Sequence, residues 1–282
     1  MKPSRLNVLT QYLVPQHALT SLAGWLSNSR WQWLKNWEIN YFIHRYNVNV
    51  EEAQLTKISD YPTFNSFFTR KLKLELRPIV AAPDAIASPA DGCISQIGKI
   101  NDDLLFQAKG SHFKLRDLLG GNDNLTQSFV NGNFATIYLS PKDYHRVHMP
   151  MTGTLRETTF IPGNLFSVNQ KTVQNVPELF ALNERLVCIF TTACGPMAVI
   201  FVGAMLVGSI KTVWGAMPHQ KITTENLSNR NITLQRGEEL GHFEMGSTVI
   251  LLFPSDKINW NPDLKETSSL KMGEFLGKTI AP

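Results

Sequence analysis

The sequence predicts an α+β protein, in which an N-terminal helical segment rich in aromatic residues precedes a mainly antiparallel β core with short helical insertions. Near the N-terminus, apolar residues recur at helical spacing: Leu19, Leu22, Ala23 and Leu26. Beyond about residue 80 the pattern changes to short apolar runs separated by glycine and proline turns. Regular helices do not alternate with these runs, so a parallel α/β fold is disfavoured.

The composition is that of a globular protein that can bury a sizeable core. The chain has 282 residues, of which 43% are hydrophobic and 18% are charged. The net charge of +4 comes without a run of Lys or Arg, which argues against a nucleic-acid partner but is compatible with an anionic membrane surface. Three cysteines without metal-type spacing predict neither disulfides nor a zinc site and favour a reducing compartment.

We expect neither a secretion signal nor a transmembrane segment. Polar residues interrupt the apolar core that a signal peptide would need after the basic N-terminus. The longest apolar run, residues 197–207, is well short of the roughly 20 residues of a spanning helix.

Residues 1 to about 50 combine helical patterning with most of the tryptophans. Basic residues lie among these rings: Arg5, Arg30, Lys35 and Arg45 accompany Trp25, Trp31, Trp33 and Trp37. Indole rings together with basic side chains are typical of a helix that lies in the lipid headgroup region. The alternative is that the rings pack on the rest of the protein or on a second subunit.

The Pro-containing link at residues 81–84 marks the predicted boundary between a helical region, 1–80, and a β-rich region, 81–282. Short helical patterning at residues 63–70 precedes it, and short helical insertions are expected at 115–119 and 177–182. The expected strands are 93–100, 104–108, 134–139, 153–161, 186–190, 197–202, 204–213 and 248–253.

Gly246 and Ser247 stand immediately before the last of these strands. A serine hydroxyl can reach the preceding carbonyl, and glycine has no Cβ to obstruct the approach, so this bond is a candidate for self-cleavage. The pair is also an ordinary turn sequence, and it needs partners from elsewhere in the chain before it indicates chemistry.

Candidate partners occur in two other segments. Asp91 stands in a predicted turn before a strand, a position that is also common for a purely structural Asp-Gly pair. His145 and His148 lie three residues apart between Pro141 and Pro150, where a long regular helix is improbable. Asp143 is the one carboxylate of this segment and completes no obvious ligand set, which disfavours a metal. Asp91, His148 and Ser247 are the residue types of a charge-relay triad, although their spacing does not show that they meet.

An ordered set of motifs now becomes recognisable along most of the chain. It comprises residues 89–92 (PADG), 139–141 (LSP), 143–150 (DYHRVHMP), 175–177 (NVP), 179–180 (LF), 183–185 (NER), 202–204 (VGA), 207–210 (VGSI) and 246–248 (GST). In this set the chain resembles the bacterial type of phosphatidylserine decarboxylase, a self-processing, pyruvoyl-dependent membrane enzyme. Met245 departs from the leucine that usually precedes Gly-Ser-Thr in the family, a change expected to alter packing slightly and the chemistry little.

The resemblance implies a role for each candidate residue. His148, oriented by Asp91, would deprotonate Ser247, which attacks the Gly246 carbonyl. Cleavage between Gly246 and Ser247 would leave a large chain, 1–246, and a small chain, 247–282, whose first residue becomes a covalent pyruvoyl cofactor. That group would form a Schiff base with phosphatidylserine and act as electron sink while carbon dioxide leaves, giving phosphatidylethanolamine. His145 would donate a proton or orient the substrate.

The resemblance also implies a cellular setting and partners. The enzyme would serve phospholipid biosynthesis as a peripheral protein on the cytoplasmic side of the inner membrane, anchored by its aromatic helices. The processed pair of chains would form a dimer of heterodimers.

Two other functions fit some of the same residues. A serine-type self-processing hydrolase would use Asp91, His148 and Ser247 as a hydrolytic triad. A non-enzymatic membrane-binding β domain would use Gly246 and Ser247 only as a turn.

Overall fold

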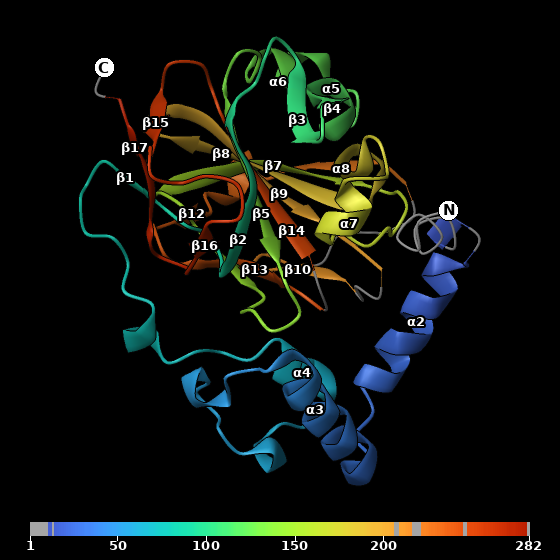
Figure 1. Ribbon diagram of the computed structural model, residues 1–282. Helices are drawn as coiled ribbons and strands as arrows, with labels where there is room; N and C mark the ends of the chain where they lie inside the picture. The colour runs from blue at the N-terminus through green and yellow to red at the C-terminus, as the bar shows by residue number, and fades with distance from the viewer. Residues whose placement is uncertain (1–10, 13, 206–208, 216–220, 245–246, 281–282) are drawn as a thin grey trace.

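Figure 1 shows the computed structural model, which describes residues 11–12, 14–205, 209–215, 221–244 and 247–280. Its α-helices are α2 (Gln16–Ser27), α3 (Gln32–Tyr46), α4 (Phe64–Phe68), α5 (Leu115–Leu118), α6 (Asp123–Gln127), α7 (Gln170–Val173) and α8 (Leu179–Leu182). Short 3-10 helices are η1 (Val50–Glu52), η2 (Ile58–Asp60), η3 (Leu74–Leu76) and η4 (Ser228–Arg230).

The strands begin after the helical N-terminal region. They are β1 (Ala85–Ala87), β2 (Gly92–Lys99), β3 (Leu104–Ala108), β4 (Ser111–Lys114), β5 (Asn133–Leu139), β6 (Arg146–His148), β7 (Gly153–Ile161), β8 (Arg185–Thr192), β9 (Gly195–Val202), β10 (Ile210–Thr212), β11 (Thr223–Asn226), β12 (Thr233–Leu234), β13 (Glu239–Phe243), β14 (Ser247–Phe253), β15 (Ile258–Trp260), β16 (Ser269–Leu270) and β17 (Phe275–Thr279).

A nine-stranded sheet forms the centre of the molecule, in the order β11-β7-β8-β9-β14-β5-β2-β16, with β12 also on β7. Strand β14 lies in its middle, antiparallel to β5 on one edge and to β9 on the other. All seven residues of β14 are buried, which explains their continuous apolar and β-branched character, because both faces of the strand are covered. The sheet therefore holds the segment after Ser247 in its interior.

Two small sheets complete the surroundings of the predicted site. Strands β10, β13 and β6 form one, which aligns the histidine segment with the residues that precede the predicted cleavage site. Strands β1, β17 and β15 form the other. Gly92 begins β2 directly after Asp91 because a Cβ there would approach the Tyr138 carbonyl oxygen to 2.3 Å.

Helices α3 and α4 form a small core of their own, which lies to one side of the sheets in Figure 1. Helix α4 begins with a capping box, in which Thr63 and Ser66 each accept the other's backbone N–H at 3.1 Å. Its phenylalanines pack with α3 in one buried cluster: Ile39, Phe42, Val48, Tyr61, Phe64, Phe67 and Phe68. Phe68 of this cluster also stacks on His145, which connects α4 with the segment that carries the two histidines.

The predicted fold class is confirmed, since helices precede a core of antiparallel sheets. The long predicted strands agree with β2, β3, β5, β7, β8, β9 and β14 within a few residues. The predicted strand 204–213 is wrong in extent, because only Ile210–Thr212 pairs with β13, and residues 206–208 lie outside the described part. Ala204 is buried but belongs to no strand, so its apolar side chain reflects packing in the core and not hydrogen bonding in a sheet.

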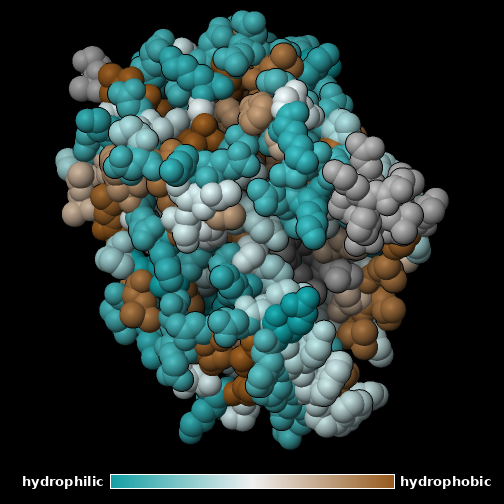
Figure 2. Space-filling model, in the orientation of Figure 1, coloured by the Kyte–Doolittle hydropathy of each residue, from teal (hydrophilic) through white to brown (hydrophobic). Residues whose placement is uncertain are grey.

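The four tryptophans in and between α2 and α3 do not belong to the buried core. Trp25, Trp31, Trp33 and Trp37 are 63–70% exposed. Figure 2 shows hydrophobic side chains gathered over α2 at the edge of the molecule, where Leu19 and Leu22 are exposed. Such a surface on a folded chain indicates a contact with a membrane or another protein.

Lys35 does not belong to this exposed basic set, contrary to the expectation from the sequence. It is buried, and its ammonium donates hydrogen bonds to the carbonyl oxygens of Ile58 (3.1 Å) and Tyr61 (2.7 Å). The lysine therefore joins α3 to the following loop. Within the described residues, no helix is both long and apolar enough to cross a bilayer.

Candidate active site

Ser247 is the first residue of β14 and lies opposite Leu139 of β5. Its side chain is completely buried, and its Oγ has no hydrogen-bond partner among the described residues. A buried hydroxyl without a partner costs about 1–3 kcal/mol, so such a group is a candidate for chemistry rather than for stability. Met245 and Gly246 lie outside the described residues, and with them lies the bond predicted to be cut.

His145 reaches this region through a tight turn after β5. Asp143 closes the turn by accepting hydrogen bonds from the backbone N–H (2.7 Å) and the hydroxyl (2.6 Å) of Ser140. The His145 carbonyl oxygen then accepts the N–H of Phe243 at 3.1 Å, which places His145 beside the strand that leads to Ser247. Leu139, next to the turn, pairs with Ser247 itself.

The His145 ring is buried and stacks on Phe68 of α4, with 4.1 Å between ring centroids. Neither ring nitrogen has a hydrogen-bond partner in the described part of the chain. Burial, reinforced by the positive charge of Arg70, lowers the pKa of His145 to about 3, although the nearby backbone of Pro141 and Ser140 acts in the opposite direction. The ring is therefore neutral near pH 7, with one N–H and one lone pair available.

His148 differs from His145, because both of its ring nitrogens have partners. Nδ1 lies 2.8 Å from the Gly237 carbonyl oxygen, which can only accept, so Nδ1 carries the proton. Nε2 then accepts the hydroxyl of Tyr144 at 3.1 Å. Burial is the main reason that the pKa of His148 lies below its ordinary value.

Asp91 lies close to the His148 segment, but its carboxylate is bonded elsewhere. The His148 N–H donates to the Pro89 carbonyl at 2.8 Å, two residues before Asp91. Arg77 donates to both oxygens of the Asp91 carboxylate from Nε (2.8 and 3.1 Å) and to one of them from Nη2 (2.5 Å), and the Met272 N–H adds a further bond at 2.9 Å.

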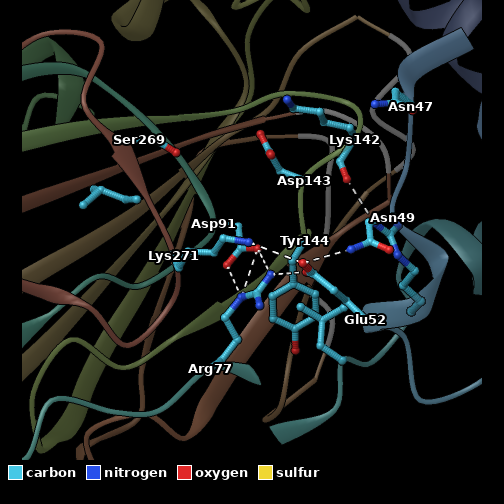
Figure 3. Close-up of a pocket in the computed structure, with 13 residues that line it drawn as sticks. Asn47, Asn49, Glu52, Arg77, Asp91, Lys142, Asp143, Tyr144, Ser269 and Lys271 are labelled. Atoms are coloured by element: carbon cyan, nitrogen blue, oxygen red, sulfur yellow. Dashed lines mark hydrogen bonds and ion pairs between the residues drawn. The ribbon is translucent and has the colours of Figure 1, made fainter. Parts of the chain in front are cut away.

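Figure 3 shows Arg77 between Asp91 and Glu52, to which Nη2 also donates at 2.6 Å. Arg77 and Asp91 are both buried, so removing either partner should cost about 3–5 kcal/mol.

The structure places Asp91 beside the His148 segment and His145 beside the strand that leads to Ser247, but it does not join Asp91, His148 and Ser247 as a hydrogen-bonded triad. Asp91 binds Arg77 rather than His148, and the Nε2 of His148 binds Tyr144. Sequence reasoning missed both Arg77 and Tyr144. Tyr144 lies inside the histidine motif and could have been noticed as a hydroxyl four residues before His148. Arg77 gave no signal beyond its place shortly before the predicted link at residues 81–84.

Metal ligands are not gathered at this site. In the part of the chain that the structure describes, no three His, Cys, Asp or Glu side chains lie together as a ligand set.

Comparison with known proteins adds a family to this geometry. A family model described as phosphatidylserine decarboxylase matches residues 64–278, and a second model, described as PSD, matches residues 6–47. The chain is 53% identical to a phosphatidylserine decarboxylase proenzyme of Alcanivorax borkumensis over 278 residues, which cover 97% of this chain and 96% of the relative.

Two further relatives have the same name. The proenzyme of Pseudomonas putida strain GB-1 is 50% identical over 98% of this chain and 99% of its own length. The proenzyme of Coxiella burnetii is 52% identical over 95% of this chain and 96% of its own length.

Proposed function

The chain belongs to the phosphatidylserine decarboxylase family, and we propose that it is a self-processing enzyme that converts phosphatidylserine to phosphatidylethanolamine and carbon dioxide. The observation that carries this proposal is a sequence identity of 50–53% to proenzymes of that name along nearly the whole chain. The buried, unpartnered hydroxyl of Ser247 supports it, because self-processing needs a serine nucleophile at this place.

The first reaction is an autocatalytic cut between Gly246 and Ser247. The Ser247 oxygen bonds to the Gly246 carbonyl carbon as the peptide C–N bond breaks, and the chain continues through an ester. Loss of the Ser247 α-proton then breaks the Cβ–O bond and expels the Gly246 carboxylate. Hydrolysis of the resulting dehydroalanine consumes water, releases ammonia and leaves a pyruvoyl group.

The surroundings of Ser247 suit such a group. The side chain is enclosed, and its oxygen has no competing partner among the described residues, so a small carbonyl could replace the hydroxyl without breaking a hydrogen bond. When formed, the pyruvoyl group supplies a carbonyl that condenses with the substrate amine and withdraws electrons as carbon dioxide leaves.

His148 is our candidate base for the cut, with Asp91 as its supporting carboxylate. In the described geometry the Tyr144 hydroxyl occupies the Nε2 lone pair of His148. The base role therefore requires that Tyr144 turn away or pass the proton on. Asp91 supports the site through Arg77 and the Met272 N–H in the same geometry.

His145 is our candidate for the decarboxylation step. Because its pKa is about 3, the ring is neutral at physiological pH and can offer one N–H as a donor. A neutral ring favours orienting the substrate over acting as a strong acid. Its two nitrogens have no partner among the described residues that would compete with a substrate.

The exposed aromatic side chains of α2 and α3 form our candidate surface for peripheral binding to the cytoplasmic side of the inner membrane. A substrate held in the bilayer requires such an approach. We further propose that residues 1–80 act as the membrane-associating region and residues 81–282 as the catalytic core. The processed large and small chains would pair as a dimer of heterodimers.

Intact mass with carbonyl labelling tests the proposed function. The purified protein should consist of chains 1–246 and 247–282, with a carbonyl that reacts with borohydride on the small chain, and should release carbon dioxide from phosphatidylserine. Ser247→Ala should remain a single chain without that carbonyl. An uncut wild-type chain would favour the non-enzymatic membrane-binding domain, and a free serine at the start of the small chain would favour the hydrolase.

A further inference from the structure

A polar cavity of about 240 Å³ lies beside the predicted site (Figure 3). Five parts of the chain enclose it: the segment from the end of α3 to η1, residues 70–77 after α4, Asp91 before β2, the turn after β5, and the segment around β16. Its charged lining residues are Glu52, Arg70, Arg77, Asp91, Lys142, Asp143 and Lys271. Since a water molecule occupies roughly 30 Å³ in the liquid, the space admits a polar group larger than water.

The cations of this cavity outnumber its carboxylates, four to three. Arg77 holds both Asp91 and Glu52, and Lys271 adds a longer contact of 3.5 Å to Glu52. Asp143 is bonded to Ser140. This pairing leaves the guanidinium of Arg70 without a carboxylate among the described residues.

Arg70 is only 4% exposed, yet most of its donors are unused. Its Nη2 donates to the Lys142 carbonyl at 3.0 Å, whereas Nε and Nη1 have no partner in the described part of the chain. The guanidinium carbon lies 5.3 Å from the centre of the Phe67 ring, which fixes its position. A buried cation with free donors is costly unless an anion satisfies it, and the guanidinium fork suits phosphate oxygens.

Arg70 also lies close to the predicted reaction centre. It follows Phe68, on which His145 stacks, by two residues. Its partner Lys142 belongs to the turn that begins next to Leu139, the residue opposite Ser247. At 1.5 Å per residue, the exposed Trp37 of α3 lies roughly 15 Å along the helix from Asn47, which lines the cavity.

The headgroup of phosphatidylserine offers three charged groups, and only one suits Arg70. The amine is a cation and is excluded. The carboxylate must lose its charge as carbon dioxide leaves, so an arginine bound to it would stabilise the ground state against the reaction. The phosphodiester keeps its charge throughout, and binding it lowers KM without opposing the chemical step.

On the premise of the proposed function, we propose that Arg70 binds the phosphodiester of the phospholipid headgroup in this cavity and so positions the serine moiety near Ser247 and His145.

Two soluble amines that differ in the phosphate test this role. Glycerophospho-L-serine carries the phosphodiester, and O-methyl-L-serine does not. Wild type, Arg70→Gln, Arg70→Lys and the control Arg116→Gln are first checked for processing by mass, and their decarboxylation of both amines is then compared. Arg116 is a suitable control because it is an exposed arginine paired with Asp123, outside the cavity.

Arg70→Gln should raise KM for glycerophospho-L-serine roughly 10- to 100-fold, since hydrogen bonds to charged groups contribute about 1.5–3 kcal/mol. The activity of Arg70→Gln on O-methyl-L-serine should stay unchanged. For glycerophospho-L-serine, the KM of Arg70→Lys should lie between those of wild type and Arg70→Gln, and the KM of Arg116→Gln should equal that of wild type. Inorganic phosphate should inhibit wild type competitively and Arg70→Gln far less.

Several results would overturn the role of Arg70. These are equal losses on both amines, no loss on either, or failure of both Arg70 variants to process. Inhibition by inorganic phosphate that depends on Arg70, without an effect of Arg70→Gln on glycerophospho-L-serine, would assign the cavity to free phosphate instead. Absence of the carbonyl from wild type would contradict the proposed function itself and is distinguished by the mass measurement.

Discussion

His145 and His148, the two histidines of one short motif, differ in the hydrogen bonding of their ring nitrogens. His148 has a partner on each ring nitrogen, whereas His145 has none among the described residues. A histidine with both nitrogens bonded is held in one tautomer, and a buried ring with free nitrogens can receive a ligand. The difference supports separate roles for the two rings.

We expect His145→Gln to cut itself normally but to lose decarboxylation by about 100-fold or more, the usual effect of losing an acid–base or orienting side chain. Mass spectrometry would measure the cut, and carbon dioxide release from phosphatidylserine the activity. Retained turnover would remove His145 from the reaction.

The same substitution should change the acid stability. The pKa of His145 is about 3 in the folded chain and 6.5 without its surroundings, so the unfolded chain binds a proton more readily between these values. The free energy of unfolding therefore falls as pH drops from about 6.5 towards 3. Urea titrations should show a shallower fall in His145→Gln, and equal slopes would contradict the burial of a neutral ring.

Residue types indicated the candidate residues, but not their bonds. Asp91 lies beside the His148 segment, and His145 lies beside the strand that leads to Ser247. The partner of Asp91 is Arg77, because a guanidinium can donate two parallel hydrogen bonds to the two oxygens of one carboxylate. Ring directions in β6 depend on its pairing with β13, a contact between segments about ninety residues apart that no local pattern contains.

At the level of elements, helix α4 connects the N-terminal region with the strand that leads to the predicted cut. The Asn65 amide donates to the Glu244 carboxylate at 2.9 Å, and Glu244 stands three residues before Ser247. Ser209 donates to the same carboxylate at 2.6 Å, and Lys211 forms an ion pair with it. Burial raises the pKa of Glu244, but these donors outweigh it and keep the group ionised.

We expect Asn65→Ala to slow the self-cleavage roughly tenfold, because a hydrogen bond to a charged group contributes about 1.5–3 kcal/mol and part of this fixes the segment before Ser247. The rate would be followed by gel electrophoresis after synthesis in a cell-free system. Asn40→Ala is a matched control, since the Asn40 amide bonds only its own helix at Asn36. An unchanged rate in Asn65→Ala would show that Glu244 is held well enough without α4.

The elements that could be predicted were those in which burial alone produces a recognisable apolar pattern. Strands β9 and β14 are continuous apolar runs because both of their faces are covered. Strands such as β12 and β16 have two residues each and exist through their partners β7 and β2. No periodicity can appear in so short a segment, which is why they were missed.

For the whole molecule, the exposed aromatic side chains of α2 and α3 are the feature that its own packing leaves unexplained. Removing residues 1–37 to test them would also cut α3, whose Ile39 and Phe42 belong to the buried N-terminal core. Point substitutions preserve that core. The fold class could be predicted because it follows from patterning, but the exposed side of α3 could not, since its apolar residues occur all round the helix.

We expect Trp33→Ser with Trp37→Ser to reduce binding to anionic vesicles severalfold, because each ring would otherwise enter the headgroup region. Co-sedimentation with vesicles measures the binding. Ile222→Ser is the control, because Ile222 is an apolar residue of the β-rich region that is also more than half exposed. If both variants bind as wild type does, these rings serve another contact.

The central position of β14 bears on the order of folding and the proposed cleavage. The strands after Ser247 pair with β5 and β9 on the two edges of β14, with β2 at one end of the main sheet, and with β1 in a small sheet. An uncut chain assembles these contacts as one molecule, whereas two separate chains would have to meet in solution, at a rate that depends on concentration. On the proposed cut, the sheet would form in the uncut chain before the bond breaks. Refolding of the denatured product would then require two chains to associate.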